Sequence, residues 1–250
     1  MWRIAVREGK TVAGYPGAGR IWEIDLLRGI AILLMVVFHL LYDLAEFYHF
    51  PIDYSNGLVY YTGKTSAALF ILVAGASSSF SRNNLRRGLK VFSLGILIFI
   101  VTSVLLPGSN IIFGILQFLG FSMLLFPLFQ KLPGYALTAL GTAVLLTGLY
   151  ASRLTMPNNW LAPIGLPGQN FYSADYYPVL PWFGVFLFGA ALSKLLYKKK
   201  KSLFRFDLNY NPLVLLGRFS LPVYLAHQPL ILIILFLMLN LPFLINRGFF

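Results

Sequence analysis

Two ionisable side chains, Arg28 and His39, lie eleven residues apart inside a strongly apolar stretch of the sequence. Eleven helical steps of 100° return to within about 20° of the same face, and Asp25 and Asp43 fall near that face too. A histidine can act as a base or a nucleophile near neutral pH, and a guanidinium suits phosphate oxygens. The spacing therefore predicts one polar helix face equipped for proton or group transfer and for phosphate binding.

Further polar residues fall inside apolar stretches, where ionisable groups are costly and usually functional. With a rise of 1.5 Å per residue, Arg28 and Arg218 would lie about 6 to 7 Å from one membrane surface. A second polar layer is expected in the opposite half of the membrane: His39, Lys64, Gln117, His227 and Gln228. Structural roles stay open for them, such as an Arg28–Asp25 ion pair, a snorkelling Lys64 and glutamines that link helices.

The composition indicates which elements must hold these residues. Hydrophobic residues make up 58% of the 250 residues and charged residues 11%, whereas a soluble domain carries roughly a quarter charged residues. This excludes an ordinary cytosolic enzyme, a disordered chain and a typical DNA-binding domain, and it predicts an all-α, polytopic membrane bundle. About seven stretches are apolar enough to cross a bilayer: Ile24–Leu41, Leu58–Phe80, Leu89–Leu106, Ile111–Phe129, Tyr135–Tyr150, Val179–Tyr197 and Leu213–Leu239.

The basic residues predict how the bundle is oriented. They gather in loops on the side of the amino terminus, whereas the first loop on the other side is acidic, with Asp43, Glu46 and Asp53. The positive-inside rule then predicts a cytoplasmic amino terminus and an external carboxyl terminus in the cell membrane. Residues 1–23 would form a cytoplasmic arm and residues 24–245 the transmembrane domain. Because the basic clusters border apolar runs, we expect contact with membrane lipids and no nucleic-acid partner.

The sequence contains no cysteine, which excludes thiolate metal sites and an acyl-cysteine intermediate. No metal is expected, because His49 and Asp53 are too sparse to form a zinc site. His39 and His227, at matching depth, leave open a haem held between helices. The long external loop from Ser152 to Tyr177 is rich in Asn, Gln, Trp and Tyr, and would face a polar substrate or lie on lipid headgroups.

Four segments carry recognisable motifs: Asp25–His39, Phe113–Gly120, Leu180–Gly189 and Leu216–Pro229. In this order they resemble the heparan-α-glucosaminide N-acetyltransferase catalytic-domain family. That family is similar in turn to the broader transmembrane acyltransferases, which share an arginine, ten residues and a histidine in their first helix. The resemblance covers the chain from about Glu23 to Met238.

The resemblance implies an enzyme that moves an acyl group, typically acetyl, from cytoplasmic acetyl-CoA to a glycan or lipid-linked acceptor on the external side. It implies His39 or His49 as the catalytic histidine, because the lysosomal member carries asparagine at the His39 position and its acetyl-handling histidine follows the first helix. We expect Asp43 to orient His39, and Lys64 and Asp175 to meet the acceptor. The residues expected at the donor are Arg28, Arg218, Asp25, Gln117, Trp182, Tyr224, His227 and Gln228.

The residues alone leave a second function open, a transporter or lipid flippase whose polar layers line a path without covalent chemistry. Such a protein moves unmodified solute and is indifferent to CoA. The sequence determines neither the acceptor, the acyl chain length, nor the choice between a ping-pong and a ternary mechanism. The oligomeric state is equally undetermined, and a homodimer stays open.

Overall fold

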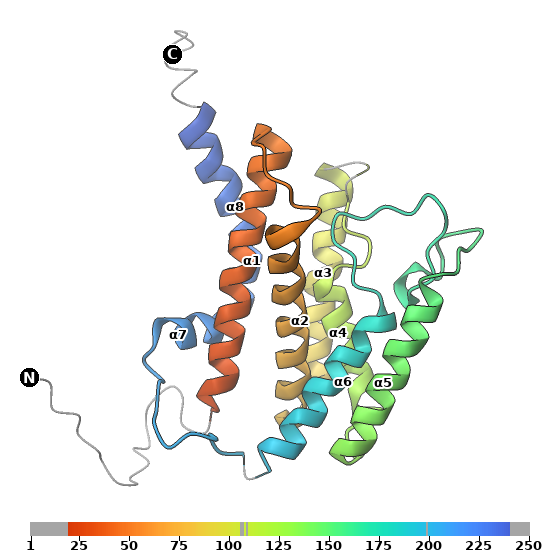
Figure 1. Cartoon of the computed structure of the whole chain (residues 1–250), viewed down its shortest axis with the longest axis vertical. Helices are drawn as coiled ribbons and strands as arrows, with labels where there is room; N and C mark the ends of the chain where they lie inside the picture. The colour runs from red at the N-terminus through yellow and green to blue at the C-terminus, as the bar shows by residue number, and fades with distance from the viewer. Residues whose placement is uncertain (1–19, 106–107, 109, 199, 241–250) are drawn as a thin grey trace, which may run out of the picture.

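The computed structural model describes residues 20–105, 108, 110–198 and 200–240, and this part of the chain is an all-helical bundle (Figure 1). Short 3₁₀ turns follow α4 and precede α6, and a π-helical turn extends α8. The predicted fold class is therefore confirmed. The helices are α1 (Trp22–Tyr48), α2 (Gly57–Phe80), α3 (Asn84–Leu105), α4 (Ile115–Leu125), α5 (Gly134–Ala151), α6 (Val179–Leu196), α7 (Pro212–Arg218) and α8 (Ser220–Leu235).

Six of the helical segments in the described residues are long and apolar enough to span a membrane, one fewer than the sequence predicts. The exception is α4, which begins at Ile115 instead of Ile111. The preceding residues stay extended because the loop before α6 binds them, with Tyr177 donating its N–H to the Phe113 carbonyl at 2.9 Å. The Ser173 hydroxyl likewise accepts the N–H of Ile112 at 3.0 Å.

The last predicted span is broken into α7 and α8. Phe219 leaves the helical conformation, with φ −97° and ψ 23°. Proline has no N–H to donate and fits the first turn of a helix best, and Pro222 stands in the first turn of α8 when that helix restarts at Ser220. The break places Arg218 at the end of one helix, beside the start of the next.

The first helix is longer than predicted, because it continues to Tyr48. Asp43 and Glu46, expected in an acidic external loop, therefore lie in the last turns of α1. His49 ends the helix in a left-handed conformation with φ 57°, and its N–H binds the Ala45 carbonyl at 3.2 Å.

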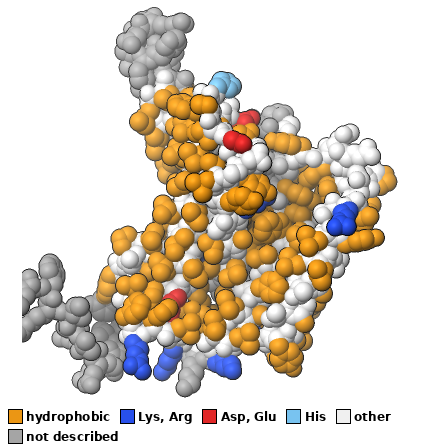
Figure 2. Space-filling view, viewed as in Figure 1, with side chains coloured by type: hydrophobic (Ala, Val, Ile, Leu, Met, Phe, Trp, Pro, Cys, Tyr) orange, Lys and Arg blue, Asp and Glu red, His pale blue; other side chains and the backbone are white. Residues whose placement is uncertain are grey.

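The two ends of the bundle differ in charge. We call the end where α1 and α3 begin and α2 and α6 end the basic end, because it carries Arg20, Arg82, Arg86, Arg87, Lys90, Lys194, Lys198 and Lys200. Figure 2 shows basic side chains along this lower edge, beneath a broad apolar surface. The opposite end, the loop end, carries residues 152–178 and the end of α1. The positive-inside prediction of orientation rests on this difference in charge between the two ends.

Close backbone contacts between helices depend on glycine. A Cβ atom on Gly189 of α6 would lie 1.8 Å from the Leu72 carbonyl oxygen of α2, and one on Gly75 would lie 1.9 Å from that of Phe186. Nearer the basic end, a Cβ on Gly29 would lie 1.9 Å from the Leu213 oxygen, so α1 and α7 touch in the same way. Larger side chains would separate these helices.

We expect Gly189→Ala to lower the free energy of unfolding by on the order of 1 to 3 kcal/mol, because the added methyl group must displace α2 backbone. The melting temperature of purified protein in detergent measures this. Gly141→Ala is the matched control, since its Cβ would meet its nearest atom at 3.1 Å. Equal melting temperatures for the two variants would contradict the packing argument.

Candidate functional site

At the basic end, the carboxylate of Asp25 holds three arginines. Asp25 is only 3% exposed. Its oxygens accept from Arg20 at 2.9 and 3.0 Å and from Arg28 at 2.7 Å, and the Arg218 Nε lies 3.6 Å from Oδ2. The predicted Arg28–Asp25 ion pair is therefore present, but it belongs to a larger cluster that carries net positive charge.

Further bonds fix the direction of the two less exposed guanidinium groups. Arg28 donates to the Ser77 hydroxyl at 2.6 Å and to the Gly217 carbonyl at 3.5 Å. Arg218 donates to the side-chain oxygen of Asn209 at 2.5 Å. The two arginines thus join α1, α2 and α7, and both line the space between these helices.

That space is a cavity of about 760 Å³. Its mouth is cationic and its interior is apolar, where it is lined by α2, α4 and α8. Ten residues separate Phe80 from Phe70 along α2, so the lining extends over about 15 Å of that helix. The cationic lining residues are Arg20, Arg28, Arg82, Arg87, Lys90, Lys200 and Arg218, and the uncharged ones include Phe70, Leu116, Leu119, Met123 and Tyr224.

A pair of histidines adjoins this cavity through Tyr224, which lines it. The ring centroids of His39 and His227 are 4.8 Å apart with the rings nearly perpendicular, and the Tyr224 ring lies 5.4 Å from His227. The Nδ1 atoms contact carbonyl oxygens of the preceding helical turns, His39 that of Met35 at 2.9 Å and His227 that of Tyr224 at 2.5 Å. The sequence placed the two histidines at one depth, and the structure brings them into contact.

Asp43 has a different partner from the one expected. This fully buried carboxylate accepts two hydrogen bonds from Gln228, each 2.9 Å long. The His39 ring is oriented instead by the Met35 carbonyl of its own helix. Asp43 and Gln228 therefore join α1 to α8 directly beside the histidine pair.

The polar residues of the loop end meet at the start of α4. Asp175 accepts the Ile115 N–H at 2.9 Å and caps this helix from the long loop. Gln117 closes the same turn by accepting the Gly114 N–H at 2.8 Å. Burial raises the pKa of Asp175 to about 6, although the Ile115 N–H and the charge of Lys64 oppose this. Asp175 is thus a carboxylate that titrates close to neutral pH.

Three further residues were expected at the substrates: Trp182, Lys64 and His49. Trp182 packs on Tyr177, with 5.1 Å between ring centroids. Lys64 is exposed and lies over the Tyr60 ring at 5.4 Å, within electrostatic reach of Asp175. His49 is also exposed, and ten residues of helix, about 15 Å, separate it from His39. The structure does not bring His49 to the histidine pair.

Sequence reasoning missed several residues at the cavity. Ser77, Phe70 and Arg87 line it although none was proposed. The signal for Ser77 was weak, because it lies in an apolar stretch beside two other serines. Arg87 belongs to one of the basic clusters that border apolar runs, and for these clusters the sequence predicts only contact with lipid.

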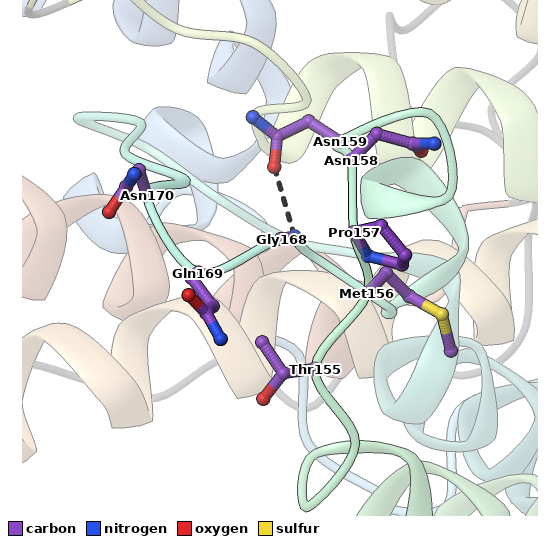
Figure 3. Close-up of a pocket in the computed structure, with 8 residues that line it drawn as sticks. All are labelled: Thr155, Met156, Pro157, Asn158, Asn159, Gly168, Gln169 and Asn170. Carbon is purple, nitrogen blue, oxygen red and sulfur yellow. Dashed lines mark hydrogen bonds between the residues drawn. The ribbon is translucent and has the colours of Figure 1, made fainter.

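The long loop forms a second, separate pocket of about 470 Å³ at the loop end (Figure 3). Its rim is stabilised by Asn159, whose side-chain oxygen accepts the Gly168 N–H at 2.9 Å. All of its lining side chains are uncharged: Thr155, Met156, Pro157, Asn158, Asn159, Gly168, Gln169 and Asn170. Within the described residues, no group of three or more histidines and acids is placed to hold a metal ion.

Comparison with known protein families identifies the family to which this chain belongs. Residues 20–229 match the family described as heparan-alpha-glucosaminide N-acetyltransferase, catalytic. The chain belongs to this family. The matched range begins at Arg20 and ends just after Gln228, so it includes both the arginine cluster and the histidine pair. Membership in the N-acetyltransferase family indicates a membrane acetyltransferase. No curated protein and no solved structure matched the chain.

Asp25→Asn should lower the free energy of unfolding by on the order of 2 kcal/mol, because it leaves the largely buried Arg28 and Arg218 without their counter-ion. The half-exposed Arg20, 48% accessible, should add little. Thermal unfolding in detergent measures the change. Asp53→Asn, in an exposed loop, serves as the control, and an equal loss there would contradict a special role for Asp25.

The raised pKa of Asp175 also predicts a pH dependence. A carboxyl group with a folded-state pKa of about 6, above its ordinary 3.8, favours the folded state when protonated, so its contribution to stability is lost as pH rises from about 4 to 6. We expect the melting temperature difference between wild type and Asp175→Asn to change in this window and to be constant above pH 7. A constant difference from pH 4 to 8 would show that the pKa of Asp175 is not raised.

Proposed function

We propose that the protein transfers an acetyl group from acetyl-CoA, bound at the basic end, to a glycan or lipid-linked acceptor reached from the loop end. The observation that carries this proposal is the cavity that starts among arginines and ends at Tyr224, against the histidine pair. Following the positive-inside rule, the basic end would face the cytoplasm, where acetyl-CoA is found, in the cell membrane.

The two ends of the cavity suit the two parts of CoA. Arg28 and Arg218, held by Asp25, and Arg87 would bind phosphate oxygens, because guanidinium groups form paired hydrogen bonds to them. The apolar interior between Phe70 and Leu119 would receive the uncharged pantetheine arm. The thioester would then lie near Tyr224, beside the histidines.

An imidazole is the group that would carry out the chemistry. Transfer from a thioester needs a nucleophile to hold the acyl group or a base to deprotonate the acceptor, and histidine serves both purposes. His39 lies on the polar face of α1 that begins at Arg28, and it contacts His227. We therefore favour His39 over the exposed His49 as the catalytic histidine, with Asp43 and Gln228 holding α1 and α8 together around it.

The loop end would receive the acceptor. Asp175 and Lys64 lie near the start of α4, where they would meet the hydroxyl or amine that accepts the acyl group. The loop pocket, at the same end of the bundle, offers amide and hydroxyl groups without charge, which supports an acceptor with neutral hydroxyl groups, such as a sugar. Amide side chains can both donate and accept hydrogen bonds with such hydroxyls.

Purified protein in lipid vesicles tests the proposal with acetyl-CoA labelled in the acetyl group. We expect acetyl to appear on an α-glucosaminide or on an added lipid-linked sugar, with release of free CoA. A transporter or flippase would instead move the sugar unmodified and would ignore CoA. Absence of CoA release with every acceptor would overturn the proposed function.

His39→Ala should lower the steady-state transfer rate by about 100-fold or more, which is the usual contribution of a positioned acid–base or nucleophilic group. Its binding of CoA, measured by thermal shift, should be unchanged because the arginine cluster is intact. Leu33→Ala is the control on the same helix, since Leu33 is 46% exposed and helical spacing places it on a different face of α1 from Arg28 and His39. Full activity of His39→Ala would exclude this residue.

A further inference from the structure

The polar face of α8 continues the lining of the cavity. Ser220 and Tyr224 line it, and His227 lies seven residues after Ser220, so it falls within about 20° of the same helix face. The Tyr224 ring contacts His227 at 5.4 Å, and His227 contacts His39 at 4.8 Å. Tyr224 thus connects the cavity lining to His227, and His227 in turn contacts His39.

The hydrogen bonds of the two rings define their tautomers. A carbonyl oxygen only accepts, so each Nδ1 that contacts one must carry the hydrogen. His39 Nδ1 therefore donates to Met35, and His227 Nδ1 donates to Tyr224. The basic lone pair of each imidazole is then on Nε2, and the chain itself holds both rings in this form.

The Nε2 atom of His227 has no hydrogen-bond partner among the described residues, although it is buried. The residue as a whole is only 8% exposed. A buried polar atom without a partner costs free energy, and such atoms commonly mark catalytic or ligand-binding positions. Its lone pair is free to attack a carbon atom, which a hydrogen-bonded nitrogen could do only after losing its partner.

We propose that the two histidines divide the reaction, with His227 accepting the acyl group and His39 accepting the proton of the acceptor. This inference rests on the proposed function and specifies its mechanism. It follows from three observations: His227 contacts the cavity-lining Tyr224, its buried Nε2 has no hydrogen-bond partner among the described residues, and its ring contacts His39. The proposal assigns His227 a catalytic role beyond binding of the donor.

The bonds balance in two steps. In the first, His227 Nε2 attacks the thioester carbonyl carbon to form a tetrahedral adduct. The C–S bond of this adduct breaks, CoA leaves as a thiolate, and a positively charged acyl-imidazolium remains on His227. In the second, the acceptor oxygen or nitrogen attacks the acyl carbon and its proton passes to His39 Nε2, while the C–N bond to His227 breaks. The proton on His39 finally neutralises the CoA thiolate, which restores both neutral rings.

A single-turnover experiment without acceptor separates the two roles. Wild-type protein is mixed with acetyl-labelled acetyl-CoA, quenched within milliseconds to seconds, and assayed for free CoA and for label on the protein that hydroxylamine removes. We expect wild type and His39→Ala to form the labelled protein, and His227→Ala to form at least about 100-fold less. In steady state with acceptor, both variants should be slow.

His227→Asn provides a second test if the alanine variant folds poorly, because it keeps a polar side chain but offers no imidazole. Leu230→Ala, 53% exposed on the same helix, should label like wild type. Retention of label in folded His227 variants, or its loss in His49→Ala alone, would overturn the proposal. Wild type that turns over with acceptor but never carries label would also overturn it, whereas no CoA release at all would instead defeat the proposed function.

Discussion

The site depends on one buried carboxylate that holds arginines from different helices in the same place. Asp25 can do this only because α1 and α7 touch, and they touch because glycines face each other: a Cβ on Gly217 would lie 1.8 Å from the Asp25 carbonyl oxygen. Three cations around one anion leave excess positive charge in a partly desolvated setting, where electrostatic attraction is strong. Excess positive charge of this kind favours the binding of an anion.

The sequence was sufficient for features that depend on helical periodicity. The shared face of Arg28 and His39, the helical bundle and the matching depth of His39 and His227 all follow from spacing along one helix at a time. Depth does not predict neighbours, however, because it says nothing about which helices pack together. The two histidines are in contact because α1 packs on α8, and the spacing within a single helix does not predict this packing.

Two of the expectations that differed from the structure have the same cause, a tertiary contact with a segment distant in sequence. Hydropathy predicted a full fourth span, but the loop before α6 binds residues 112–113 and shortens α4. Helical spacing suggested that Asp43 would orient His39, but Gln228 from another helix takes both carboxylate oxygens. The break at Phe219 has a local origin, the restart of α8 with Pro222 in its first turn, and it places Arg218, expected near the start of one continuous span, at the end of α7. The partners of residues 112–113 and of Asp43, by contrast, are distant in sequence.

The separation of charge along the bundle explains why an acyl carrier inside the membrane would be useful. The phosphates of a CoA donor are far too costly to move through a low-dielectric interior, and the arginines that line the cavity and would bind them lie at the basic end. A polar acceptor meets the same barrier from the other side. The acetyl group is small and uncharged, so in the proposed mechanism it is the part of the donor that would pass Tyr224 at a low cost in desolvation free energy. In the proposed mechanism, the two histidines in contact would receive the acetyl group from one substrate and release it to the other, and one of them would hold the proton.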